Sequence, residues 1–117
     1  MKNILIVEND KTCGLYIEKV LEKKYKTILA RTGQEAIDIF KINEVDLVLL
    51  DIRMPEMDGF MILEGIRSVS KNVPVVTQTS YNSSRSKELI MALGSNDYIL
   101  KPYLPQELLE IVEKNIV

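Results

Sequence analysis

The residues best suited to chemistry in this 117-residue chain stand just past short apolar runs. They are Glu8, Asn9 and Asp10, then Asp51, then Thr79 and Ser80, and finally Lys101. Several carboxylates brought together repel one another unless a cation neutralises them, and oxygen ligands with open water positions suit Mg²⁺. A lysine and a hydroxyl opposite such a metal suit the remaining oxygens of a phosphoryl group. These residue types therefore favour phosphoryl transfer onto a carboxylate, and Asp51 is the best placed nucleophile.

The chain has no histidine and a single cysteine, Cys13, which removes many alternatives. Without histidine, Ser-His-Asp and Cys-His catalysis, His-ligated zinc and an internal phosphohistidine are excluded. Cys13 can form neither an intramolecular disulfide nor a cysteine metal cluster. Its place in a predicted helix favours a small buried or half-buried thiol. Carboxylates, lysine, hydroxyls and a hard cation held by oxygen remain.

Five apolar runs must position these residues. They are continuous rather than alternating, which predicts strands covered on both faces of a parallel sheet. The runs are residues 4–7, 27–29, 47–50, 73–76 and 98–100. Ligands of such sheets bind outside the carboxyl ends of the strands, where the polar residues stand.

Segments with helical spacing separate the runs. The first covers about residues 11–24, and its apolar positions include Leu15, Ile17, Val20 and Leu21. The second begins at a Thr32-x-x-Glu35 capping box, and its apolar face carries Ala36, Ile37 and Phe40. A third covers roughly 59–69 with Phe60, Leu63 and Ile66 inward, a fourth covers roughly 84–93 before Gly94, and a fifth starts at Pro105. This alternation predicts one domain, residues 1–117, with a doubly wound five-stranded parallel sheet and helices on both faces.

Composition narrows the function classes further. The net charge of −2 gives no electrostatic reason to expect nucleic-acid binding, and 46% hydrophobic with 27% charged residues is ordinary for a globular protein. No apolar run reaches the length of a membrane span, and the first residues lack the apolar region of a signal peptide. We therefore expect a cytoplasmic domain with no membrane insertion.

Each polar residue also has an ordinary structural role. Asp10 stands where a helix N-cap is expected, and Asp58 in the Asp-Gly pair suits a turn or cap. Thr79 and Ser80 alone would suit a polar strand terminus. Their combination with Lys101 at one sheet edge favours a site instead.

Four segments resemble the receiver domains of two-component response regulators. They read "ILIVEND" (4–10), "LVLLDIRMPEMDGF" (47–60), "VPVVTQTSY" (73–81) and "NDYILKPY" (96–103), and the resemblance covers essentially the whole chain. It implies a flavodoxin-like (βα)₅ fold that takes a phosphoryl group from the phosphohistidine of a sensor histidine kinase or histidine phosphotransfer protein. It also implies a signalling phosphoacceptor domain rather than an enzyme, although one that assists its own phosphorylation and dephosphorylation.

The resemblance assigns roles to residues of the expected site. Asp51 resembles the phosphoacceptor, and Lys101 resembles the lysine that contacts the phosphoryl oxygens. Glu8 and Asn9 fall where the family has an acidic pair that holds Mg²⁺, and the Arg53 backbone carbonyl falls at a further ligand position.

The resemblance also implies a switch. Thr79 matches the switch hydroxyl and Tyr98 the switch aromatic, while Pro102 resembles a residue that follows the lysine through a cis peptide. Phosphorylation would re-shape the surface of the fourth helix, fifth strand and fifth helix, where we expect a downstream protein target or output domain to bind near Tyr98 and Tyr103. Arg53 and Tyr81 lie where family members tune phosphoryl lifetime.

Asn9 departs from the family pattern because its amide oxygen can ligate Mg²⁺ but adds no charge. One alternative is therefore a pseudo-receiver, an interaction module that works without phosphorylation. Another is a phosphatase-type hydrolase, which the absence of a second acid two residues after Asp51 disfavours.

Overall fold

The computed structural model describes residues 1–54, 57–80 and 84–116, with the backbone alone at 84–86. The strands are β1 (Asn3–Val7), β2 (Lys26–Ala30), β3 (Leu47–Asp51), β4 (Val75–Thr79) and β5 (Asp97–Leu100). The helices are α1 (Lys11–Leu21), α2 (Gly33–Ile42), α3 (Gly59–Val69), α4 (Ser84–Ala92) and α5 (Pro105–Asn115). All strand pairs are parallel, in the order β2-β1-β3-β4-β5. The predicted doubly wound fold is confirmed.

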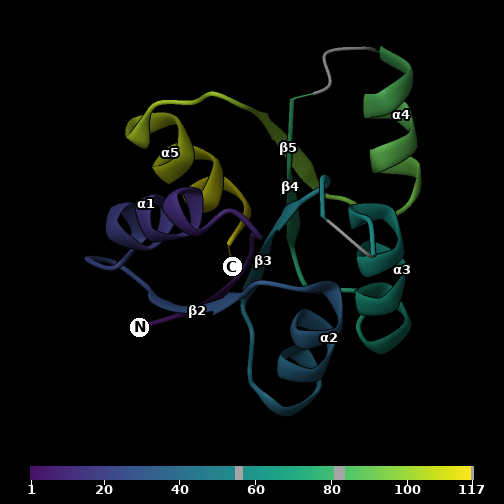
Figure 1. Ribbon diagram of the computed structural model, residues 1–117, viewed down its shortest axis with the longest axis horizontal. Helices are drawn as coiled ribbons and strands as arrows, with labels where there is room; N and C mark the ends of the chain where they lie inside the picture. The colour runs from purple at the N-terminus through teal and green to yellow at the C-terminus, as the bar shows by residue number, and fades with distance from the viewer. Residues whose placement is uncertain (55–56, 81–83, 117) are drawn as a thin grey trace.

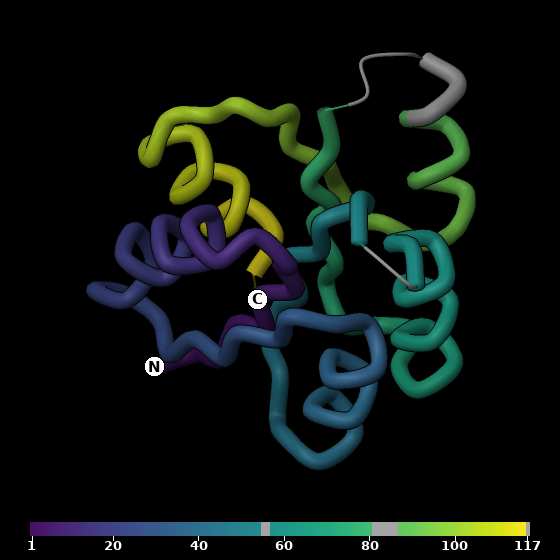
Figure 2. The backbone as a smooth tube through the Cα atoms, in the orientation of Figure 1, coloured from purple at the N-terminus to yellow at the C-terminus, as the bar shows by residue number. Residues whose placement is uncertain are grey.

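The helices cover both faces of this sheet. Figure 1 shows α1 and α5 on one side and α2, α3 and α4 on the other, and Figure 2 shows α1 and α5 lying side by side. Successive strand residues point to opposite faces, so Ile4 and Ile6 pack towards α1 and α5, while Leu5 and Val7 pack towards α2 and α3. This two-sided burial explains why the central strands read as continuous apolar runs.

The fourth strand differs most from its prediction. We expected residues 73–76, but β4 runs from Val75 to Thr79, so both ends were wrong. Pro74 has no amide to donate and lies before the strand, where its carbonyl accepts from the Val48 amide at 2.9 Å. Thr77, Gln78 and Thr79 are polar but buried, and an apolar-run criterion does not find buried polar strand residues.

Smaller differences concern helix ends and faces. Helix α1 ends at Leu21 rather than near residue 24, and Leu15 on it is exposed. Phe60 of α3 is half-buried, whereas Leu63 and Ile66 are buried as expected. Gly94 has the positive φ of 108° that a residue after a helix end adopts. No helix in the described part of the chain is long and apolar enough to cross a bilayer.

Side-chain caps fix the helix starts that lead away from the site. The Asp10 carboxylate accepts from the Cys13 amide at 2.9 Å, and the Asp58 carboxylate accepts from the Met61 amide at 3.0 Å. Each cap satisfies an amide that the first helical turn leaves unpaired. The expected Thr32 cap is also present, with its hydroxyl accepting from the Glu35 amide at 3.1 Å.

Gly59 begins α3 directly against the segment after β3. A Cβ at this position would lie 2.4 Å from the Ile52 Cα and 2.9 Å from the Asp51 carbonyl oxygen. Only glycine permits this approach, so the backbone around Asp51 is held by the start of α3.

Candidate functional site

The strand order reverses between β1 and β3, and this reversal brings two acids together. Glu8 follows β1 and Asp51 ends β3, so both carboxylates lie at the carboxyl edge of adjacent strands. Both side chains are almost fully buried, with Glu8 2% and Asp51 6% exposed. Ligands of doubly wound sheets bind at such a reversal of strand order.

Lys101, the residue directly after β5, contacts both carboxylates. Its Nζ donates to the Glu8 Oε1 at 2.8 Å and to the Asp51 Oδ2 at 2.9 Å. The other Asp51 oxygen accepts from the Arg53 amide at 2.9 Å. The Lys101–Pro102 peptide bond is cis, as the resemblance implies. Three of the predicted site residues, Glu8, Asp51 and Lys101, therefore form one hydrogen-bonded cluster.

Burial changes the proton affinities within this cluster. Burial, together with the neighbouring Glu8 carboxylate, raises the pKa of Asp51 to about 6, although Lys101 opposes the shift. Burial would also raise the pKa of Glu8, but its hydrogen bonds with Asp51 and Lys101 outweigh burial and lower it. The two carboxylates hold the pKa of Lys101 above its usual range, although burial opposes this. At neutral pH Asp51 is therefore largely ionised beside a cationic Lys101.

Asn9 lies beside this cluster and is exposed. Its Nδ2 donates to the Arg31 carbonyl at 3.1 Å, across the carboxyl end of β2. Asp10 is occupied as the α1 cap, and its amide donates to the Glu8 Oε2 at 3.3 Å. The described residues contain no group of three or more acidic, histidine or cysteine side chains arranged to hold a metal ion.

The expected switch residues lie on neighbouring strands. Thr79 is the buried last residue of β4, where it pairs in register with Leu100. Tyr98 pairs two residues earlier, opposite Thr77, and is half-buried with its ring centroid 5.1 Å from the Lys87 Nζ of α4. Arg53 is exposed at the mouth of the site. Tyr81 lies outside the described residues.

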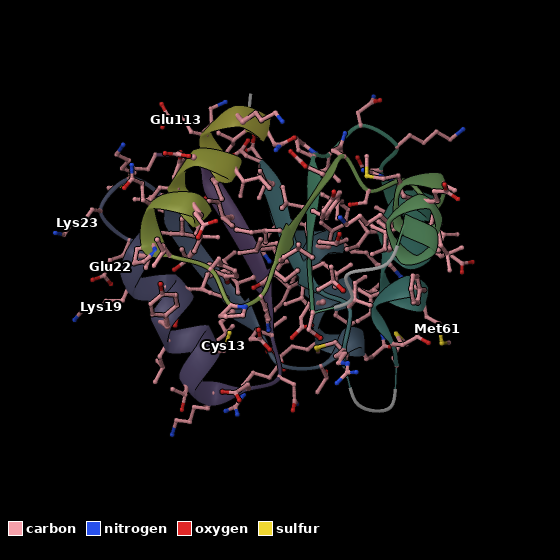
Figure 3. The ribbon with its side chains drawn as sticks, turned by 90° about the horizontal axis from the view of Figure 1, so that it is seen from above. Cys13, Lys19, Glu22, Lys23, Met61 and Glu113 are labelled. Carbon is pink, nitrogen blue, oxygen red and sulfur yellow. The ribbon has the colours of Figure 1, made fainter. Side chains whose placement is uncertain are left out.

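Two contacts beside the cluster were not predicted. Burial and the neighbouring Glu8 carboxylate raise the pKa of the Cys13 thiol to about 12, so the thiol expected to be merely buried lies beside the site. In Figure 3 Cys13 lies on the inner side of α1, whereas Lys19, Glu22 and Lys23 point outward. The Tyr103 hydroxyl donates to the Gln78 Oε1 at 2.5 Å. The sequence signal for this second contact was a glutamine, Gln78, that closely follows an apolar run.

The fold and the buried carboxylate–lysine cluster place the chain in a class of small doubly wound α/β domains with an acidic site at the carboxyl edge of the sheet. Residues 4–113 match the response regulator receiver domain family. The chain belongs to this family, and is a signalling receiver domain of two-component response regulators.

Individual relatives agree with this assignment. Over 91% of the chain, 42% of residues are identical to a transcriptional regulatory protein, YvrH, of Bacillus subtilis, and over 88% of the chain 31% are identical to the Escherichia coli regulator PcoR. The chain spans only 45% and 46% of these proteins.

Solved structures agree as well. The chemotaxis protein CheY4 of Vibrio cholerae superposes with a TM-score of 0.95 at 25% identity, and 99% of each chain is covered. A receiver domain of a histidine kinase from Syntrophus aciditrophicus superposes with a TM-score of 0.88 at 29% identity, covering 97% of this chain and 89% of that one.

Proposed function

We propose that this domain accepts a phosphoryl group on Asp51 from the phosphohistidine of a partner, which is a sensor histidine kinase or a histidine phosphotransfer protein. The observation that carries the proposal is the position of Lys101, whose ammonium lies 2.9 Å from an Asp51 oxygen and 2.8 Å from Glu8. A cation fixed beside a nucleophilic carboxylate neutralises both that carboxylate and the incoming phosphoryl oxygens.

The donor atoms at this edge fit Mg²⁺, because they are oxygens of carboxylates and amides. Glu8, Asp51, the Asn9 side-chain oxygen and the Arg53 backbone carbonyl would hold it. The Asn9 Nδ2 already donates to Arg31, so the other amide atom, Oδ1, is the one that suits a cation. When bound, Mg²⁺ supplies positive charge that offsets the phosphoryl oxygens and the two acids. With Asn9 in place of an acid, the site holds one negative charge fewer.

In the transfer step an Asp51 carboxylate oxygen forms a bond to phosphorus as the phosphorus–nitrogen bond of the donor breaks. The imidazole leaves with the electron pair of that bond and takes its proton from solvent. Lys101 and the Thr79 hydroxyl contact phosphoryl oxygens, and the Arg53 amide keeps the second Asp51 oxygen in place. Because the carboxylate is largely ionised at neutral pH, no base is needed to activate it.

We further propose that phosphorylation moves a two-state surface. Thr79 would move towards the phosphoryl group, and the Tyr98 ring would leave Lys87 and turn inward. The surface of α4, β5 and α5 then presents a different shape to a downstream protein target or output domain. The relatives are named as transcriptional regulators, and with a net charge of −2 we assign protein contacts, not nucleic-acid contacts, to the receiver domain itself.

One observation favours a second candidate, a pseudo-receiver that binds partners without being phosphorylated. Asn9 replaces an acid, and the described residues hold no cluster of three acids for a metal. The Glu8–Lys101–Asp51 cluster favours the phosphoacceptor, because two nearly buried carboxylates and a half-buried ammonium are costly to desolvate where they only maintain a fold.

Intact mass decides between the two candidates. The protein is mixed with Mg²⁺ and acetyl phosphate, beside an Asp51→Asn variant and a sample with chelator. Uptake of one phosphoryl group, absent in the variant and the chelated sample, supports the phosphoacceptor. Absence of uptake that Asn9→Asp restores would instead support the pseudo-receiver.

A further inference from the structure

Gln78 is a buried glutamine near the carboxyl end of β4, next to the candidate site. It pairs in register with Asp51 on β3 and with Ile99 on β5, and its carbonyl accepts from the Ile52 amide at 3.0 Å. Its side chain points to the same sheet face as Val76, towards α1 and α5. There the Gln78 Oε1 accepts from the Tyr103 hydroxyl at 2.5 Å.

A glutamine at this position is unfavourable for stability alone. Gln78 is fully buried, and its Nε2 has no hydrogen-bond partner among the described residues. A buried amide that satisfies only part of its hydrogen-bonding capacity is less stable than a well-packed apolar side chain. Among the described residues Gln78 makes one side-chain hydrogen bond, to Tyr103, and this bond is therefore the feature that needs an explanation.

Tyr103 belongs to the segment that connects Lys101 to α5. Pro102 and Leu104 on either side are exposed, so Tyr103 is the side chain through which this segment packs onto the sheet. Burial raises the pKa of Tyr103 well above its usual range, so the hydroxyl keeps the proton that it donates to Gln78. The hydrogen bond between Gln78 and Tyr103, which we call the tether, therefore joins β4 to the residue two positions after Lys101.

Packing alone leaves this segment room to move. A cavity of about 430 Å³ lies beside it, lined by Cys13, Tyr16, Ser80, Lys101, Pro102 and Tyr103. The Tyr16 ring, 6.4 Å from the Tyr103 ring centroid, is itself exposed. Without a directional bond, Tyr103 could shift into this space and carry Lys101 with it.

We propose that Gln78 is a positioning residue, which through Tyr103 fixes the segment after β5 so that the Lys101 ammonium lies over Asp51. The inference rests on the proposed phosphoryl acceptance by Asp51. None of the hydrogen bonds described for Gln78 is to Lys101, so Gln78 acts on Lys101 through Tyr103. Because electrostatic stabilisation depends on preorganised distances, loosening Lys101 lowers the rate of transfer without removing the nucleophile.

Two single variants and their combination test the tether. Gln78→Leu leaves the Tyr103 hydroxyl without its acceptor, and Tyr103→Phe leaves the Gln78 amide without the hydrogen bond from Tyr103. Each single variant leaves a buried polar group unpaired and melts at a lower temperature than the double variant, which leaves neither group unpaired. The uptake rate from acetyl phosphate falls about tenfold in each single variant and stays about tenfold low in the double variant.

This separation of rate from stability is the decisive result. A purely structural role predicts that the rate recovers with the melting temperature in the double variant, and that result would overturn the proposal. Ser95→Ala is the matched control, because Ser95 is a buried hydroxyl hydrogen-bonded at the opposite end of β5, with 2.7 Å to the Asp97 carbonyl. This control loses stability but keeps the uptake rate.

A second readout needs no phosphoryl group. The Lys101 ammonium, hydrogen-bonded to two carboxylates, gives an ¹H–¹⁵N signal in the free protein that Lys101→Met identifies by its loss. We expect the signal to shift and broaden in Gln78→Leu and Tyr103→Phe and to stay in place in Ser95→Ala. If the parent takes up no phosphoryl group but the signal responds, the tether stands and the phosphoacceptor role fails. If uptake occurs and neither rate nor signal responds, the tether fails.

Discussion

Two cations stabilise opposite ends of the sheet, and they do so with different partners. At the carboxyl end, Lys101 donates to the carboxylates of Glu8 and Asp51. At the amino ends of β4 and β5, Arg67 of α3 donates to the carbonyls of Gly94 and Val73, at distances down to 2.7 Å. Arg67 also donates to the Ser70 carbonyl and to the Asn96 side-chain oxygen. We call these groups the Lys101 centre and the Arg67 clasp.

The difference shows what each end can do. Carbonyl and amide oxygens are inert, so the Arg67 clasp only joins the end of α3 to the segments that precede β4 and β5. A carboxylate is a nucleophile, so the carboxylate beside Lys101 can form a bond to a phosphoryl group, whose negative charge then lies beside the same lysine. Both ends hold a half-buried cation, but only the Lys101 centre pairs it with reactive groups.

The largest effect is expected from removing the cation of the Lys101 centre, and it concerns the rate of phosphoryl uptake. Lys101→Met removes the preorganised cation beside Asp51, and we expect the uptake rate from acetyl phosphate to fall by about a hundredfold or more. Intact mass against time measures it, with unfolding by urea in parallel. A folded variant that takes up phosphoryl groups at the parent rate would break the comparison.

Arg67→Met is expected to have the opposite profile. It leaves the carbonyls of Gly94 and Val73 without their donor and lowers the free energy of unfolding by about 2–4 kcal/mol, measured by urea denaturation. The uptake rate of the folded protein should stay within about twofold of the parent. Arg67→Lys keeps the charge but not the planar set of donors, so its stability should lie between the two. A slow but fully stable Arg67→Met would contradict the structural role.

The two ends also differ in how far the sequence predicts them. Asp51 ends a strand and Glu8 and Lys101 directly follow strands. Parallel strands bring their carboxyl ends to one edge, so the meeting of these residues follows from the order of the elements. Arg67 bonds to carbonyls of residues 70, 73 and 94, and every residue has a carbonyl, so nothing in its residue type announces these partners.

Gln78 shows the same limit within the site. The predicted fourth strand stopped at residue 76, because burial of polar side chains depends on partners that only the folded chain supplies. The contact of Gln78 with Tyr103, 25 residues away, follows from the packing of the segment after β5. Residue types and strand order predict the reactive groups, whereas the groups that hold them need the structure.

Asn9→Asp sharpens the comparison by adding a charge to the Lys101 centre. We expect Mg²⁺ to bind about tenfold more tightly, since one more carboxylate faces the cation at a partly exposed position. Titration calorimetry measures the affinity. Asp10→Asn is the control, because Asp10 caps α1 and asparagine caps a helix about as well: both its affinity for Mg²⁺ and its stability should stay close to those of the parent. An unchanged affinity in Asn9→Asp would remove Asn9 from the metal site.

Asp97, next to the Arg67 clasp, provides the smallest effect. Its carboxylate accepts from Asn115 at 3.0 Å and from the Tyr98 amide at 2.9 Å, and Lys114 lies at 3.4 Å. Burial would raise the pKa of Asp97, but these three partners outweigh it and lower the pKa. The resulting stability is present above the ordinary pKa of the carboxyl, 3.8, and is lost as the pH falls through the lowered value.

Because Lys114 is largely exposed, this contribution is below about 1 kcal/mol. Asp97→Asn should therefore be slightly less stable than the parent at neutral pH, and the difference should shrink progressively when urea unfolding is repeated at pH values below 3.8. Added salt should shrink the difference at neutral pH, since it screens exposed pairs. If the stability difference between the parent and Asp97→Asn persisted in acid, the contribution of Asp97 would not depend on its charge.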